Sequence, residues 1–199
     1  MTTQERALAL LEDYPGGREQ EWYAAQVLLW TGRPEPARSL LERFERRAPD
    51  HSDSFGPTFR SARSNLAFVL HELGRVDQAE RMFQLAIEAS QAAIDAGDEW
   101  FRHPLQIAAI HAVRGEHNEA LAWLERSFAA ADFVHGEGLR QDPMFASLLG
   151  DARFGALVDR MNRHVAAEFE RAVADGTIAV VDAISAGADP RDFLQSVGR

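Results

Sequence analysis

Apolar residues recur every three or four positions through most of the chain, and the run from Arg60 to Ala93 shows this most clearly. Such spacing places apolar side chains on one face of a helix. Gly74 lies between two apolar stretches of this run, where a glycine allows a sharp change of direction. The run therefore predicts two amphipathic helices joined by a tight turn, which together form one helical hairpin.

The same spacing predicts helices along the remainder of the chain, separated by stretches rich in glycine, proline and polar residues. No strand is expected, so the predicted fold class is all-α. A further short helix is expected within residues 175–199. The main expected helices cover about residues 3–13, 19–31, 34–48, 58–73, 76–96, 100–114, 117–131, 143–149 and 152–174.

An internal repeat organises much of the chain. Gly32, Gly74 and Gly115 are 42 and 41 residues apart. An alanine follows each glycine after five residues and lets two helices approach closely, and a bulky apolar residue four positions later fills the space between hairpins. A period of this length is typical of stacked helical hairpins. The pairs are Ala37 with Leu41, Ala79 with Phe83, and Ala120 with Leu124.

Two segments, LHELGRVDQAERMFQLAIE and HAVRGEHNEALAWLERSF, resemble the tetratricopeptide repeat. A third, LLWTGRPEPARSLLERFERRAP, is similar and carries Pro49 at the position of the family's closing proline. The resemblance extends over three units within residues 18–132. It implies a right-handed α–α superhelix of antiparallel hairpins, whose first helices line a concave groove that usually binds a peptide or another protein.

The flanking segments have different patterns. Residues 1–17 are expected to hold one helix that matches the second half of a hairpin, as at the regulatory end of a larger bacterial protein. Residues 133–174 are expected to form a helical cap, because DPMFASLLGDARFGALVDRM resembles the stretch that closes such arrays. In the tail, residues 175–199, GTIAVVDAISAGADPRDF resembles half an ankyrin repeat. A helix closed by glycine and restarted by Asp-Pro would also produce that match.

The composition excludes several chemistries. The net charge is −10, from 31 acidic and 21 basic residues, and an acidic surface disfavours nucleic acid as a partner. The chain has no lysine for a Schiff base or a phosphate loop, and no cysteine for thiol catalysis, disulfides or zinc. Neither a signal peptide nor an apolar run of about 20 residues occurs, so a cytoplasmic protein without a membrane span is expected.

The predicted superhelix would place one side of each first helix in the groove. Its mixture of aromatic and polar residues suits an extended or helical peptide, although core packing is the alternative for Trp22 and Phe68. Only Asn65 and Arg102 match the clamp with which some family members hold a C-terminal carboxylate, so that activity is not expected. The expected groove residues are Trp22, Gln26 and Trp30 from the first unit, Ser64, Phe68, His71 and Glu72 from the second, and Arg102 and Leu105 from the third.

No pattern indicates catalysis, a cofactor or a bound metal. His103, His111 and His117 are eight and six residues apart, so no two of them share one turn of a helix. His111 is expected to be a hydrogen-bonded histidine of the core. The sequence contains no serine elbow and no complete dinucleotide-binding loop.

Three functions are compatible with the sequence. The leading one is a non-catalytic protein–protein interaction scaffold that binds a peptide or protein segment in the concave groove. The alternative is a small-molecule-sensing regulatory domain, in which Trp22, Trp30, Phe68 and Arg102 would enclose an aromatic-lined pocket. A helical enzyme that uses histidine and carboxylates is the third. Self-association into a homodimer is a further option, because a terminal hairpin without a polar cap exposes apolar area that a second copy can cover.

Overall fold

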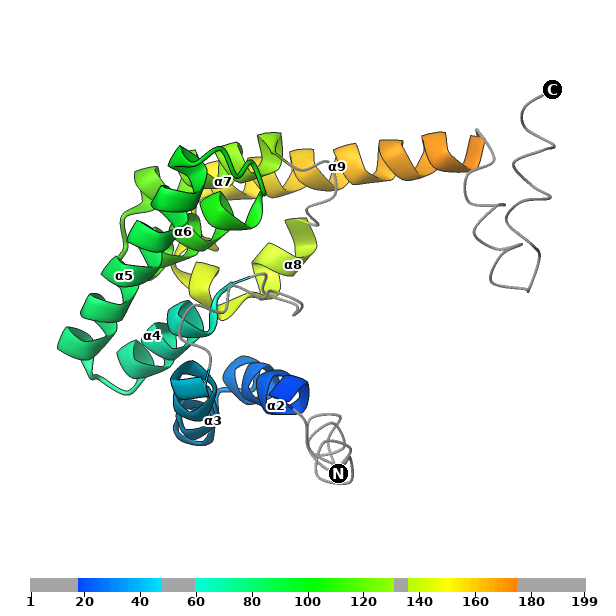
Figure 1. The fold of residues 1–199 in the computed structure, drawn as a ribbon. Coiled ribbons are helices and arrows are strands. Elements are labelled where there is room, and N and C mark those ends of the chain that lie inside the picture. The colour runs from blue at the N-terminus through cyan, green and yellow to red at the C-terminus, as the bar shows by residue number, and fades with distance from the viewer. Residues whose placement is uncertain (1–17, 48–59, 131–135, 175–199) are drawn as a thin grey trace.

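The computed structural model describes residues 18–47, 60–130 and 136–174, and within these ranges every regular element is a helix, which confirms the all-α prediction. The helices expected over residues 3–13 and within 175–199 lie outside the described residues. Figure 1 shows the arrangement of the elements. They are α2 (Arg18–Trp30), α3 (Pro34–Arg47), α4 (Ala62–Glu72), α5 (Val76–Asp95), α6 (Arg102–Val113), α7 (His117–Ala129), α8 (Gly136–Gln141), the 3₁₀ helix η1 (Pro143–Leu148) and α9 (Ala152–Ala174).

Three consecutive hairpins form the body of the described structure. Helix α2 packs on α3, α4 on α5, and α6 on α7. Contacts of α3 with α4 and of α5 with α6 join the hairpins into one stack, which Figure 1 shows running from α2 and α3 at one end to α6 and α7 at the other. The predicted stack of hairpins is therefore present, whereas the division of the chain into four segments stays a prediction.

The three repeated glycines make the same turn. The φ angles of Gly32, Gly74 and Gly115 are 68°, 72° and 74°, a left-handed backbone that favours glycine. In each turn the next backbone N–H donates to the carbonyl five residues earlier, as Arg75 does to Leu70 at 2.8 Å. This is the Schellman arrangement, which satisfies carbonyls that the end of a helix leaves open. The predicted tight turns are thus confirmed.

The small and bulky residues of the repeat lie where the helices meet. All of them are at most 1% exposed, which agrees with their expected roles in close helix approach and in filling the space between hairpins. The set consists of Ala37, Leu41, Ala79, Phe83, Ala120 and Leu124.

The cap contains one helix that the sequence did not predict. The sequence predicts no helix between about residues 131 and 143, where two glycines lie, yet α8 begins at Gly136. A Cβ atom at Gly136 would lie 2.6 Å from the carbonyl oxygen of Val158, so this glycine allows α8 to approach α9 closely. Phe145 of η1 stacks on Phe154 of α9, with their ring centroids 6.2 Å apart.

Helix α9 has two unlike halves. Its first turns bury Phe154, Val158 and Met161, whereas Phe169 near its far end is exposed. Figure 1 shows that this far end extends beyond the other described helices. No helix in the described part of the chain is long and apolar enough to span a membrane.

Candidate functional site

The predicted groove residues of the first unit share one side of α2. Trp22, Gln26 and Trp30 are spaced by four residues, which places them one above the other on a helix. Trp22 is 4% exposed and Gln26 is 2% exposed, while Trp30 is half-buried against the core. The ring of Trp22 also packs on Phe44 of α3, with centroids 5.3 Å apart. The spacing therefore gathers these three side chains, in buried surroundings.

The predicted residues of the second unit divide into a buried and an exposed pair. Ser64 and Phe68 are buried in α4, and Phe68 belongs to the hydrophobic core, as Trp22 does. His71 is half-buried and Glu72 is exposed at the end of the same helix. The core-packing alternative for the two aromatic residues is therefore supported.

The predicted residues of the third unit lie in the first turn of α6. Leu105 is buried, and Arg102 is half-buried at the start of the helix. The guanidinium carbon of Arg102 lies 4.0 Å from the ring centroid of Trp100, a cation–π contact that fixes its direction. Trp100 itself is exposed and was not predicted as a groove residue.

Several buried polar side-chain atoms of α2 and α4 have no hydrogen-bond partner. Within the described residues this holds for the indole N–H groups of Trp22 and Trp30 and for both amide ends of Gln26. It also holds for the hydroxyl of Ser64 and the amide oxygen of Asn65 in α4, and for Nε of Arg60 just before that helix. Burying a polar atom without a partner costs about 1–3 kcal/mol, so folded proteins contain few such atoms.

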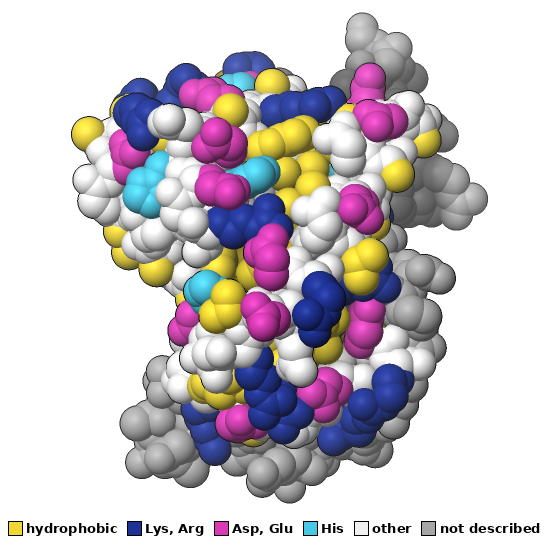
Figure 2. Space-filling view, turned by 90° about the vertical axis from the view of Figure 1, so that its left-hand side faces the viewer, with side chains coloured by type: hydrophobic (Ala, Val, Ile, Leu, Met, Phe, Trp, Pro, Cys, Tyr) yellow, Lys and Arg dark blue, Asp and Glu magenta, His cyan; other side chains and the backbone are white. Residues whose placement is uncertain are grey.

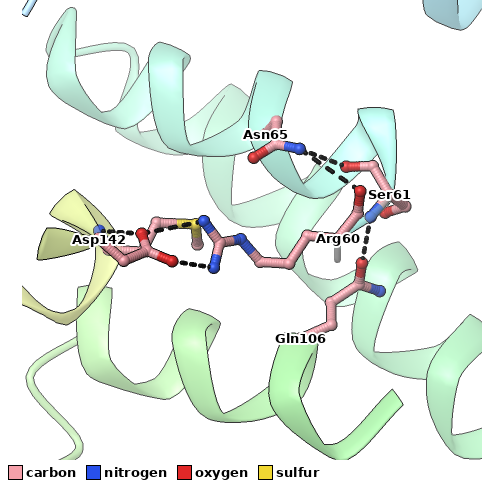
Figure 3. A network of polar contacts seen from close by, with 6 residues as sticks. Arg60, Ser61, Asn65, Gln106 and Asp142 are labelled. Carbon is pink, nitrogen blue, oxygen red and sulfur yellow. Dashed lines mark hydrogen bonds and ion pairs between the residues drawn. The ribbon is translucent and has the colours of Figure 1, made fainter. Parts of the chain in front are cut away.

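The side chain of Gln106 in α6 is surrounded quite differently. Its amide nitrogen donates to the hydroxyl of Ser90 at 2.8 Å and to the carbonyl of Ala86 at 3.2 Å. Its amide oxygen accepts the backbone N–H of Ser61 at 2.7 Å, as Figure 3 shows. Gln106 thereby links α5, α6 and the start of α4, and both ends of its amide are satisfied.

A buried ion pair completes this polar network. Two nitrogens of the Arg60 guanidinium bind the two carboxylate oxygens of Asp142, and the Nη2–Oδ1 distance is 2.9 Å. The two side chains are 0% and 5% exposed, although 82 residues separate them in sequence. Asp142 also accepts the backbone N–H of Met144 and so caps η1. Figure 3 shows Arg60 reaching from the start of α4 toward the cap.

The sequence contained only part of the signal for this pair. Asp142 followed by Pro143 is a typical N-cap, and its capping role could be predicted locally. Its second partner, Arg60, lies just before the hairpin at α4, and nothing in local sequence connects the two. Because the pair ties the second hairpin to the cap, we regard it as structural.

A shallow depression lies where the turns of the second and third hairpins meet. Its volume is about 440 Å³, and Arg114 there binds Glu80 through two nitrogens. Figure 2 views the side of the molecule toward which the turn between α4 and α5 points, and acidic and basic side chains are interspersed over it. No broad area of one sign is visible on that face. The depression is lined by His71, Val76, Glu80, Phe83, Val113, Arg114 and Glu116.

Several histidines in the described part of the chain make pairwise contacts. Nε2 of His103 lies 2.9 Å from Oδ2 of Asp98. The backbone N–H of Trp100, and then His103, hold the pKa of the Asp98 carboxyl below its usual range. His111 makes a hydrogen bond, with Glu116, but it is half-buried and does not lie in the core. Among the described residues no group of three metal-ligating side chains occurs.

The fold and these contacts define a helical-repeat protein. A tetratricopeptide repeat model matches residues 60–98, which contain α4, α5 and the turn between them. The family resemblance of the central hairpin is thus confirmed for one repeat. No curated protein and no solved structure matches the chain.

Proposed function

We propose that this protein is a non-catalytic interaction scaffold that binds a polypeptide segment along the inner sides of α2 and α4. The tetratricopeptide repeat in residues 60–98 supports an interaction role. The single observation that carries the proposal is the group of buried polar atoms without partners on this face.

The amide of Gln26 is the clearest case. An apolar residue of similar shape would fill the same space without leaving a donor and an acceptor unpaired, and the protein would be more stable. An incoming polypeptide main chain offers both a carbonyl and an N–H group at each residue other than proline. It can therefore satisfy both ends of the Gln26 amide at once.

The aromatic residues of the face supply the apolar part of the contact. Trp30 in α2 is half-buried and can present its ring to a ligand, whereas Trp22 and Phe68 pack in the core and can do so only when the face opens. Tryptophan is among the residues that most often dominate binding energy at protein interfaces. Gln26 lies between the two indoles in sequence, so hydrogen bonding and ring packing would act on the same stretch of ligand.

The face is closed in this structure, because Trp22 and Gln26 are almost inaccessible. A ligand reaches it only when the face opens. The unpaired atoms lower the cost of opening, since each of them gains a partner from water or ligand when it is uncovered. Binding is therefore coupled to a local rearrangement at the first hairpin.

Small-molecule sensing is the second candidate function. The observation that favours it is the depression near His71, whose lining includes none of the four residues expected to enclose an aromatic pocket. Its volume of about 440 Å³ falls within the usual range for ligand sites. Its lining comes from α4, α5, the end of α6 and the turn that follows α6, and it does not include α2. The affinity for a small molecule bound in this depression would fall in His71→Ala and stay unchanged when Gln26 is replaced. The two variants therefore separate the two functions.

Selection of peptides from a random library on the full chain tests the scaffold function. We expect selected peptides to bind the wild type and to lose at least about tenfold in affinity with Gln26→Met. Gln84→Met, on the exposed side of α5, is the matched control and should leave affinity unchanged. Peptides that bind equally to all three proteins would show that α2 is not the binding face.

A further inference from the structure

Building on the binding function proposed above, on which it depends, we infer that the α2 face recognises an uncharged, proline-rich segment in the polyproline II conformation. Trp22, Gln26 and Trp30 form the recognition strip. The inference concerns the chemistry of the bound segment, and three properties of the strip favour this class of ligand.

The first property is an excess of hydrogen-bond donors. Trp22 and Trp30 each have an unpaired indole N–H, and an indole can only donate. The amide of Gln26 adds two N–H bonds and one acceptor oxygen, all unpaired in the described structure. A matching ligand must therefore offer more acceptors than donors. An ordinary main chain offers equal numbers, whereas each proline keeps its carbonyl and lacks the N–H.

The second property is the spacing of the aromatic rings. Trp22 and Trp30 are eight residues apart on α2, which corresponds to about 12 Å along the helix axis. A polyproline II segment rises about 3.1 Å per residue, so four of its residues span this distance. When the face is open, proline rings can pack on the two indole rings, as they do in the aromatic-lined grooves that bind such segments.

The third property is the absence of a free charge on the strip. Its three side chains are neutral, and the neighbouring Glu21 already accepts from Arg43 of α3, at 3.2 and 3.3 Å. A charged ligand group buried here would gain no partner of opposite sign from these side chains and would be strongly disfavoured. A segment with little conformational freedom loses the least conformational entropy when it binds. Polyproline II segments have this property, because they are already extended in solution.

Fluorescence anisotropy with the full chain tests this inference. One labelled probe is an end-capped peptide of about ten prolines, and the other is an uncharged, proline-free peptide of the same length made of serine, glutamine and alanine. We expect the proline peptide to bind at least about tenfold more tightly. Trp30→Phe keeps a ring and removes the N–H, so it should weaken binding about fivefold or more, and Gln26→Met should do likewise.

Two controls keep the outcome decisive. Trp123→Phe in α7 should leave the affinity unchanged, because Trp123 lies outside the strip. Gln26→Met is expected to fold even if Trp30→Phe does not, since it removes unpaired buried atoms.

The results distinguish failure of this inference from failure of the proposed function. Equal or tighter binding of the proline-free peptide, with continued sensitivity to Gln26→Met, would overturn the ligand class and leave the scaffold function intact. If neither probe binds although library peptides bind in a way that depends on Gln26, the ligand class is likewise overturned and the scaffold function is left intact. If every peptide binds Gln26→Met as tightly as it binds the wild type, both the ligand class and the proposed scaffold function are overturned.

Discussion

Two buried glutamines show how differently this molecule treats its interior polar groups. Gln26 is 2% exposed and Gln106 is 6% exposed, so burial alone does not distinguish them. Gln106 makes three hydrogen bonds, to Ser61, Ala86 and Ser90, whereas neither end of the Gln26 amide has a partner in the described residues. The difference indicates a structural role for Gln106 and supports the binding role that we propose for Gln26.

The surroundings of the two side chains explain the contrast. Gln106 lies at a seam where α6 meets α5, the start of α4 and η1, and the Arg60–Asp142 pair closes the same region. The main packing partner of α2 is α3, which covers Trp22 with the ring of Phe44 but offers Gln26 no polar group. The seam therefore holds the stack together, and the α2 face keeps unused hydrogen-bonding capacity.

The largest expected effect comes from breaking the ion pair at the seam. Arg60→Met leaves the buried carboxylate of Asp142 without its charged partner and should destabilise the protein by about 3–5 kcal/mol. Urea unfolding of the variant measures the loss. Arg160→Met removes a pair with Glu125 in which both side chains are about half exposed, and it should cost less than about 1 kcal/mol. Equal losses in the two variants would contradict a structural role for the buried pair.

A smaller loss is expected at Gln106. Gln106→Met keeps a side chain of similar length but leaves the N–H of Ser61 and the hydroxyl of Ser90 without this partner. We expect a loss of about 1–3 kcal/mol in the free energy of unfolding. An unchanged unfolding midpoint would show that the seam does not depend on these hydrogen bonds.

The smallest effect on stability is expected from the Asp98 carboxyl. Like the Gln106 amide it has hydrogen-bond partners, but unlike that amide it is largely exposed. The pKa of Asp98 is lower in the folded protein than in the unfolded chain, where it is about 4. Its contribution to stability is therefore fully present above the unfolded pKa and is lost as the pH falls through the lower, folded pKa. An NMR titration should place the Asp98 midpoint below about 4, the ordinary value for an aspartate. A midpoint in the ordinary range would show that the bonds from Trp100 and His103 do not persist in solution.

The repeated hairpins could be predicted from sequence because their signals are local. Gly32, Gly74 and Gly115 take the left-handed conformation that ends each first helix, and the spacing of apolar residues sets the helices on either side. Helix α8 was missed because glycine normally disfavours a helix, whereas Gly136 is required there by the nearness of Val158.

The site could be predicted only in part. A spacing of four residues shows that Trp22, Gln26 and Trp30 share one side of a helix. Whether a buried amide finds partners depends on helices that are distant in sequence, and sequence alone gives no sign that Gln26 lacks them and Gln106 has them. The pairing of Arg60 with Asp142 across 82 residues was beyond prediction for the same reason.

The free energy of unfolding of Gln26→Met, measured in urea beside the wild type and Gln106→Met, tests the central claim most directly. If the Gln26 amide is kept for a ligand at the expense of stability, its replacement should raise the free energy of unfolding by about 1–3 kcal/mol, while Gln106→Met lowers it. A loss of stability in Gln26→Met comparable to that in Gln106→Met would contradict the account, because it would mean that Gln26 is also a structural residue.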